Sequence, residues 1–143
     1  MFDTLPAQIG AVLMVLGCGF AFWKGDEPEK LGAGAYAIAW FASLLIQSFG
    51  DLTSPLQFGV MAVDVVVLAV FALLSWKAKR PWAVWATSLQ ALVVMTHVLG
   101  MIDLRPTMQA FISAINVVSF GIIACLIVGA FWAWQERKAA GLE

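Results

Sequence analysis

One acidic residue, Asp64, lies in the middle of a long apolar stretch, and no lysine or arginine falls near its depth in that stretch. An ionised, unpaired carboxylate in such a position costs about 2.5–3.5 kcal/mol on membrane-insertion scales. The cost is avoided if burial keeps the carboxyl protonated, or if a cation, a hydrated ion or His97 neutralises it. The sequence therefore indicates a proton or cation site at Asp64. The alternative is a structural carboxyl that holds helices together through Asn116 or Gln90.

Further polar residues recur at helical spacing in four apolar stretches. Steps of three, four and seven residues place side chains on one face of a helix. Because polar groups that face lipid are costly, we expect these faces to turn inward and to line one cavity that opens to the outside. The residues on these faces are Ser43, Gln47 and Asp51; Gln57 and Asp64; Gln90 and His97; and Gln109, Ser113 and Asn116. The predicted ligand- or ion-binding residues among them are Asp64, Gln90, His97, Asn116, Gln47 and Asp51.

His97 is the only histidine, so one chain cannot supply bis-histidine haem ligation. With Asp51, Asp64 and Asp103 it would make at most a weak site for a divalent ion, because the usual motif spacing is absent. The other interpretation is an interfacial histidine that makes one hydrogen bond. We therefore predict no metal site, and the sequence identifies no cofactor.

Composition defines the surroundings in which these residues work. The chain has 143 residues, of which 62% are hydrophobic and 12% charged, and its mean hydropathy is +0.91. Soluble domains are about 45–50% apolar and about 25% charged, so lipid must replace water around most of this chain. The net charge of -1 excludes no class of protein, but the lack of a basic stripe argues against nucleic-acid binding. The two cysteines lie in separate apolar runs, which favours two buried thiols over a disulfide.

Five apolar runs are long enough to cross a bilayer as helices, which takes about 20 residues. An open sheet would leave backbone groups unpaired in lipid, so the predicted fold is all-α, a five-helix membrane bundle with very short loops. We expect the whole chain, 1–143, to form one membrane domain, and Pro28 to lie in the first loop. The spans are predicted at about 7–23, 31–49, 56–76, 81–100 and 107–134.

The distribution of Lys and Arg predicts the orientation. Seven of these residues fall on one side of the predicted bundle, and Arg105 alone falls on the other. By the positive-inside rule the basic side is cytoplasmic, so the N-terminus lies outside and the first helix is a retained span. Six of the seven tryptophans fall at the cytoplasmic ends of helices, which is typical of anchoring at the headgroup level. A bacterial inner membrane is the predicted location.

Small residues recur along several of the predicted helices at steps of three, four or seven, and such faces let helix backbones approach closely in lipid. We expect them to pack within the bundle, with a partner subunit or a second copy against the fifth helix as the alternative. The residues are Gly10, Gly17 and Ala21; Ala35, Ala39 and Ala42; and Ala110, Ala114, Gly121, Cys125 and Gly129.

A short, tryptophan-rich chain of five spans is similar in architecture to the TspO translocator family, which binds tetrapyrroles and sterols. That family's proline- and tryptophan-rich first loop is replaced here by Lys-Gly-Asp-Glu-Pro-Glu-Lys at 24–30, and its helical tryptophan motifs are absent. The membrane-embedded N-terminal glutamate of small multidrug transporters is absent too. The resemblance ends at architecture, and no family is assigned.

Two functions compete on these grounds. The first is binding or transport of a small ligand, proton or cation in the polar cavity around Asp64. The second is an accessory or scaffold subunit of a larger membrane complex, with no activity of its own. An enzyme is not expected, because the sequence holds no nucleophile beside a base, no paired carboxylates at helical spacing and no phosphate-binding loop.

Overall fold

The structure is a computed structural model that describes residues 5–48, 54–102 and 107–142. Within these ranges the chain forms five helices and no strand, which confirms the all-α prediction. The helices are α1 (Leu5–Lys24), α2 (Glu27–Ser48), α3 (Ser54–Ala78), α4 (Pro81–Ile102) and α5 (Met108–Ala139). Three segments are long and apolar enough to cross a membrane, namely Phe58–Ala78, Pro81–Ile102 and Gln109–Ala139. The protein is therefore a helical bundle with the character of a membrane protein.

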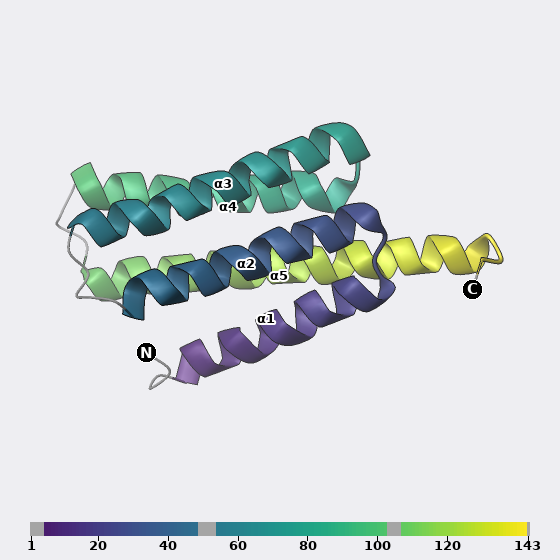
Figure 1. Ribbon diagram of the computed structural model, residues 1–143, viewed down its shortest axis with the longest axis horizontal. Helices are drawn as coiled ribbons and strands as arrows, with labels where there is room; N and C mark the ends of the chain where they lie inside the picture. Colours follow the sequence, from purple (N-terminus) through teal and green to yellow (C-terminus); the bar gives the residue numbers. More distant parts are fainter. Residues whose placement is uncertain (1–4, 49–53, 103–106, 143) are drawn as a thin grey trace.

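The five helices run up and down and form a ring. Each packs against its neighbours in the chain, α1 also packs against α5, and α2 reaches across the ring to α5. Figure 1 shows α3 and α4 together along one side, α2 and α5 in the middle and α1 on the other side, with the end of α5 projecting beyond the bundle. The α1–α2 turn, the α3–α4 turn and the end of α5 lie at the same end, which we call the basic end.

Local sequence explains where the helices begin and end. The second helix begins at Glu27, earlier than the predicted 31, and Pro28 lies in its first turn rather than in a loop. Proline is tolerated there because first-turn N–H groups have no helical partner, and acidic residues in this turn complement the helix dipole. At the α3–α4 turn Lys79 has a φ of 51°, the left-handed conformation that commonly ends a helix.

The core consists of the inner faces of all five helices. On α5 it includes Ile122, Leu126, Ala130 and Ala133, spaced so that they form one stripe, and Phe71 of α3 is fully buried in the same core. Glycines on α1 and α5 also face inward, because a Cβ on Gly17 would lie 2.7 Å from Ile123 and one on Gly129 would lie 2.5 Å from Trp82. Gly17 and Gly129 therefore pack within the bundle, as predicted, whereas Ala110 and Ala114 of the predicted α5 stripe are exposed, so the prediction is wrong for those two.

The tryptophans divide into two groups. Trp23, Trp76 and Trp85 are largely exposed at the basic end, in keeping with anchoring at the membrane surface. Trp82 was expected to do the same, but only 3% of it is exposed, so that expectation is wrong. Its indole fits between two glycines, since a Cβ at Gly32 would lie 2.7 Å from the ring and one at Gly129 would lie 2.5 Å from it.

Candidate functional site

Asp64 of α3 lies between Gln90 and His97 of α4, and we call these three residues the Asp64 group. The Gln90 side-chain amide donates to Oδ1 of Asp64 at 2.9 Å and to the Asp64 backbone carbonyl at 3.1 Å. The His97 Nε2 lies 2.9 Å from Oδ2 of the same carboxyl. Both carboxyl oxygens therefore have a polar partner inside a pair of apolar helices.

Helix geometry explains why these residues meet. Gln90 and His97 are seven residues apart, two turns on one face of α4, and that face packs against α3. Gln90 is 1% exposed, whereas the side chains of Asp64 and His97 keep 19% and 16% of their surface exposed. The carboxyl of Asp64 and the imidazole of His97 are thus more exposed than the Gln90 side chain.

The contact between Asp64 and His97 can hold one proton in two ways. The imidazole donates from Nε2 to an ionised carboxylate, or a protonated carboxyl donates from Oδ2 to Nε2. Because Gln90 keeps donating to Oδ1 in either state, it fixes the orientation of the carboxyl while the proton moves. The sequence left open several ways to neutralise Asp64. In the structure, His97 is in position to do so directly.

The remaining predicted site residues are not joined to this group. Asn116 of α5 and Gln47 of α2 are half-buried, and within the described ranges neither makes a hydrogen bond to Asp64. On α5, Gln109 and Ser113 are exposed, because the apolar face with Ile115 and Ile122 turns into the bundle instead. Polar residues of α5 therefore do not all turn inward as expected. Asp51 and Asp103 lie outside the described residues, as does the side chain of Gln57.

Tyr36 of α2 extends the polar interior and was not predicted. It is the only tyrosine of the chain and is buried, its side chain hydrogen-bonds to Ser119, and it lies within electrostatic reach of Asp64. A lone tyrosine inside an apolar helix was the available signal, because a buried phenol needs a partner. Within the described residues no three His, Cys, Asp or Glu side chains converge as metal ligands would. Both cysteines are free thiols.

A second polar cluster at the basic end was also missed, and it centres on Glu29, whose side chain is fully buried. The indole N–H of Trp82 donates to Oε1 of Glu29 at 2.7 Å, and the backbone N–H of Asp26 donates to Oε2 at 3.0 Å. The second contact is the reach-back half of a capping box, with Asp26 before the helix and Glu29 at its third position. The run Asp-Glu-Pro-Glu at 26–29 is the sequence pattern that could have predicted this cap.

Two arginines complete the cluster. Arg80, in the α3–α4 turn, bonds to Asp26 at 3.1 Å and to Glu136 at 2.6 Å, and its Nε lies 3.9 Å from Glu29. Arg137 of α5 pairs with Asp26 and donates to the Lys24 carbonyl at 2.7 Å. The hydrogen bond that Arg80 donates to Glu136 raises the pKa of Arg80, and the nearby carboxylates add to the effect. We call this cluster the Glu29 clasp: Asp26, Glu29, Arg80, Trp82, Glu136 and Arg137.

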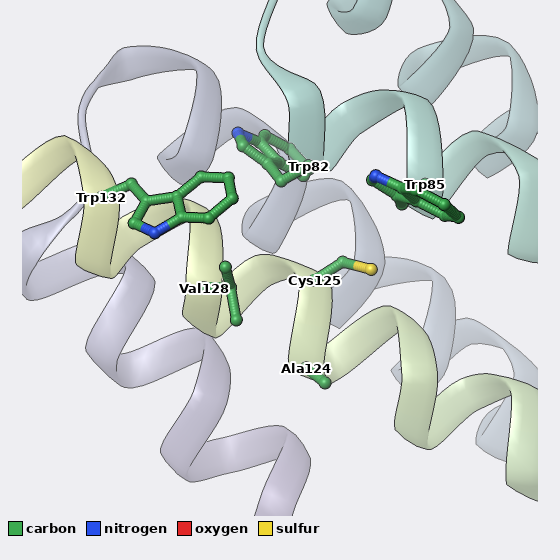
Figure 2. Close-up of a pocket in the computed structure, with 6 residues that line it drawn as sticks. All are labelled: Trp82, Trp85, Ala124, Cys125, Val128 and Trp132. Carbon is green, nitrogen blue, oxygen red and sulfur yellow. The ribbon is translucent and has the colours of Figure 1, made fainter.

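An apolar pocket of about 260 Å³ lies between α4 and α5 towards the basic end, on the surface of the bundle rather than in its interior. Figure 2 shows three indoles around it, with the Cys125 thiol on its floor. Its lining is almost entirely apolar, so it has the character of a membrane-facing surface rather than of a polar cavity. The lining residues are Trp82, Trp85, Ala124, Cys125, Val128 and Trp132.

Comparison of the chain with protein-family models, with curated proteins and with solved structures finds no match.

Proposed function

We propose that this protein is a five-span membrane protein, with its N-terminus outside and its basic end in the cytoplasm, that binds or transports a proton, cation or small ligand at Asp64. The positive-inside rule supports the orientation. The Lys and Arg residues of the described chain occur at helix ends or in turns of the basic end: Lys24, Lys30, Lys77, Lys79, Arg80, Arg137 and Lys138.

The observation that carries the functional proposal is the 2.9 Å contact between His97 Nε2 and Asp64 Oδ2. Ionisable residues within membrane spans are rare, and they mark proton relays and ion pathways more often than structure alone. An imidazole and a carboxyl in hydrogen-bond contact can pass a proton from one to the other.

Each member of the Asp64 group has a distinct part in the proposed function. Asp64 takes the proton or the cation. His97, partly exposed and nearer the end of α4, exchanges it with the outer side. Gln90 holds the carboxyl in place and keeps Oδ1 occupied by a donor, which directs exchange to Oδ2. The partial exposure of Asp64 and His97 supports access from that side.

The test is proton flux in proteoliposomes that enclose a pH-sensitive dye, measured after a step in external pH. We expect wild-type protein to speed equilibration and Asp64→Asn to abolish the increase, because the amide cannot exchange a proton. The matched control is Glu27→Gln, which neutralises an exposed carboxyl at the start of α2. Mass spectrometry of the purified protein identifies any small molecule that co-purifies. Equal flux for Asp64→Asn and wild type, together with an unchanged set of bound molecules, would contradict the proposal.

The accessory-subunit alternative has one observation in its favour. In the first half of α5, Ala110, Ser113, Ala114 and Val117 form an exposed stripe, although this helix is apolar enough to span a membrane. Small exposed residues at this spacing suit the close approach of another helix. Co-purification of a larger membrane protein in fixed ratio from mild detergent, lost on Ala114→Leu, would support this alternative.

A further inference from the structure

The carboxylate of Glu29 is fully buried, and it lies in the first turn of α2 at the basic end, whereas His97 lies near the opposite end of α4. Buried ion pairs give little net stability, since desolvation offsets most of the attraction, and apolar replacements are often neutral or stabilising. Their best-attested use is to select one of several arrangements. The position and contacts of Glu29 therefore suggest a role in switching.

Contacts run continuously from the Glu29 clasp towards Asp64. Glu29 holds the indole of Trp82, and the ring of Phe71 meets that indole edge-on, with centroids 6.3 Å apart. Tyr36 stacks on Phe71, also with ring centroids 6.3 Å apart, and its side chain hydrogen-bonds to Ser119 of α5. Phe71 has no exposed surface. Three aromatic rings thus separate the two polar clusters of the bundle.

From these contacts we propose that the Glu29 clasp and the Tyr36–Phe71–Trp82 layer form a closed gate between Asp64 and the basic end. The inference rests on the proposed function, because a gate matters only if something passes Asp64. In this structure the gate is shut while Asp64 and His97 keep partial exposure. Passage to the basic end requires Glu29 to release Trp82, which frees the ring layer to move.

The clasp is arranged so that one event loosens several segments. Arg80 joins the α3–α4 turn to Asp26 and Glu29 at the α1–α2 turn and to Glu136 near the end of α5. Loss of the Arg80 charge leaves the buried Glu29 carboxylate with the Trp82 indole N–H and the Asp26 backbone N–H as its remaining partners in the described chain, which favours its exposure. Opening at Arg80 therefore frees the α3–α4 turn from the α1–α2 turn and from Glu136, while Arg137 still holds Asp26 and the Asp64 group keeps its own hydrogen bonds.

Cys18 is a natural reporter of the gate. It is 5% exposed, and its thiol contacts the carbonyl of Ala33, one helical turn from Glu29. The experiment measures the rate at which a charged, water-soluble methanethiosulfonate modifies Cys18 in a Cys125→Ser background. We expect Arg80→Gln to raise this rate roughly tenfold, which corresponds to about 1.4 kcal/mol of lost closure. Lys77→Gln removes an exposed charge at the same end and serves as the matched control.

A second reporter separates local opening from general loosening. Val93→Cys, combined with Cys18→Ser and Cys125→Ser, places the thiol at a buried position on α4 beside the Asp64 group. Because an open gate connects the basic end with Asp64, the gate predicts that Arg80→Gln speeds labelling of Cys18 and of this thiol when the reagent is added on the basic side of proteoliposomes, and leaves labelling from the outer side unchanged. Equal acceleration from both sides, or no acceleration at Cys18, overturns the gate. Neither outcome depends on proton flux, so failure of the gate and failure of the Asp64 proposal are distinguishable.

Discussion

Replacing Gly129 by alanine tests the packing that holds Trp82 in place. A Cβ at this position would lie 2.5 Å from both Cγ and Cδ1 of the indole and 3.0 Å from Cδ2. Ordinary contacts between carbon atoms are about 3.5–4.0 Å, so the ring must move by about 1 Å. Gly32 blocks the opposite side of the ring, and Glu29 holds its nitrogen at 2.7 Å. The indole therefore has no direction in which to move without losing a contact.

The size of the effect follows from these contacts. Overpacking a tight core costs about 1–3 kcal/mol, and loss of a hydrogen bond to a charged group costs about 1.5–3 kcal/mol. Alanine recovers about 0.5–1 kcal/mol through its better helix propensity. We therefore expect Gly129→Ala to lower the free energy of unfolding by about 2–4 kcal/mol.

Equilibrium unfolding in mixed detergent micelles, followed by circular dichroism, measures this difference. Gly19→Ala is the matched control, because nothing lies within 4 Å of a Cβ built at Gly19 and the substitution keeps only the gain in helix propensity. We expect Gly19→Ala to be as stable as wild type or slightly more stable. If Gly129→Ala and Gly19→Ala have the same free energy of unfolding, Trp82 is not confined as described, and nothing then holds the layer of aromatic rings in place.

Two further predictions concern the interior. Gln90→Leu should lower the free energy of unfolding by about 1–2 kcal/mol, because Oδ1 of Asp64 loses its donor in a low-dielectric setting. Combining this change with Asp64→Leu should remove most of that cost. Additive effects of the two changes in a double-mutant cycle would refute the coupling. In the native protein a small membrane-soluble maleimide should modify Cys125, which lies half-exposed in the tryptophan-lined pocket, at least about tenfold faster than buried Cys18, as peptide mass spectrometry would show. Equal rates would mean that the pocket is closed in the native protein.

Hydropathy was sufficient to predict most of the fold, because lipid solvation makes long apolar runs helical whatever their detailed sequence. The ends of the third, fourth and fifth helices lie within a few residues of their predicted positions, and Pro81 begins α4 as expected. The start of α2 was missed because a polar, proline-containing segment was interpreted as a loop. In fact Asp26 and Glu29 form a helix cap, which depends on residue order and not on mean hydropathy.

The candidate site was predictable only in part, for a similar reason. The seven-residue spacing of Gln90 and His97 indicated a shared face, and Asp64 was conspicuous for its charge. Which helices pair, and at what height, depends on packing, so the same reasoning placed Asn116 with Asp64 although no hydrogen bond joins them in the described chain. Trp82 was misassigned because burial between Gly32 and Gly129 requires contacts far apart in sequence.

The Glu29 clasp has a consequence for how the protein is made. Asp26 finds Arg80 54 residues later in the chain and Arg137 111 residues later. At a synthesis rate of about 5–20 residues per second, Asp26 therefore waits roughly 3–11 s for its first partner and roughly 6–22 s for its second. The hairpin of α1 and α2 thus leaves the ribosome before either arginine partner of Asp26 has been made. The end of α5 binds this turn last, so the Glu29 clasp can be complete only after all five helices have been made.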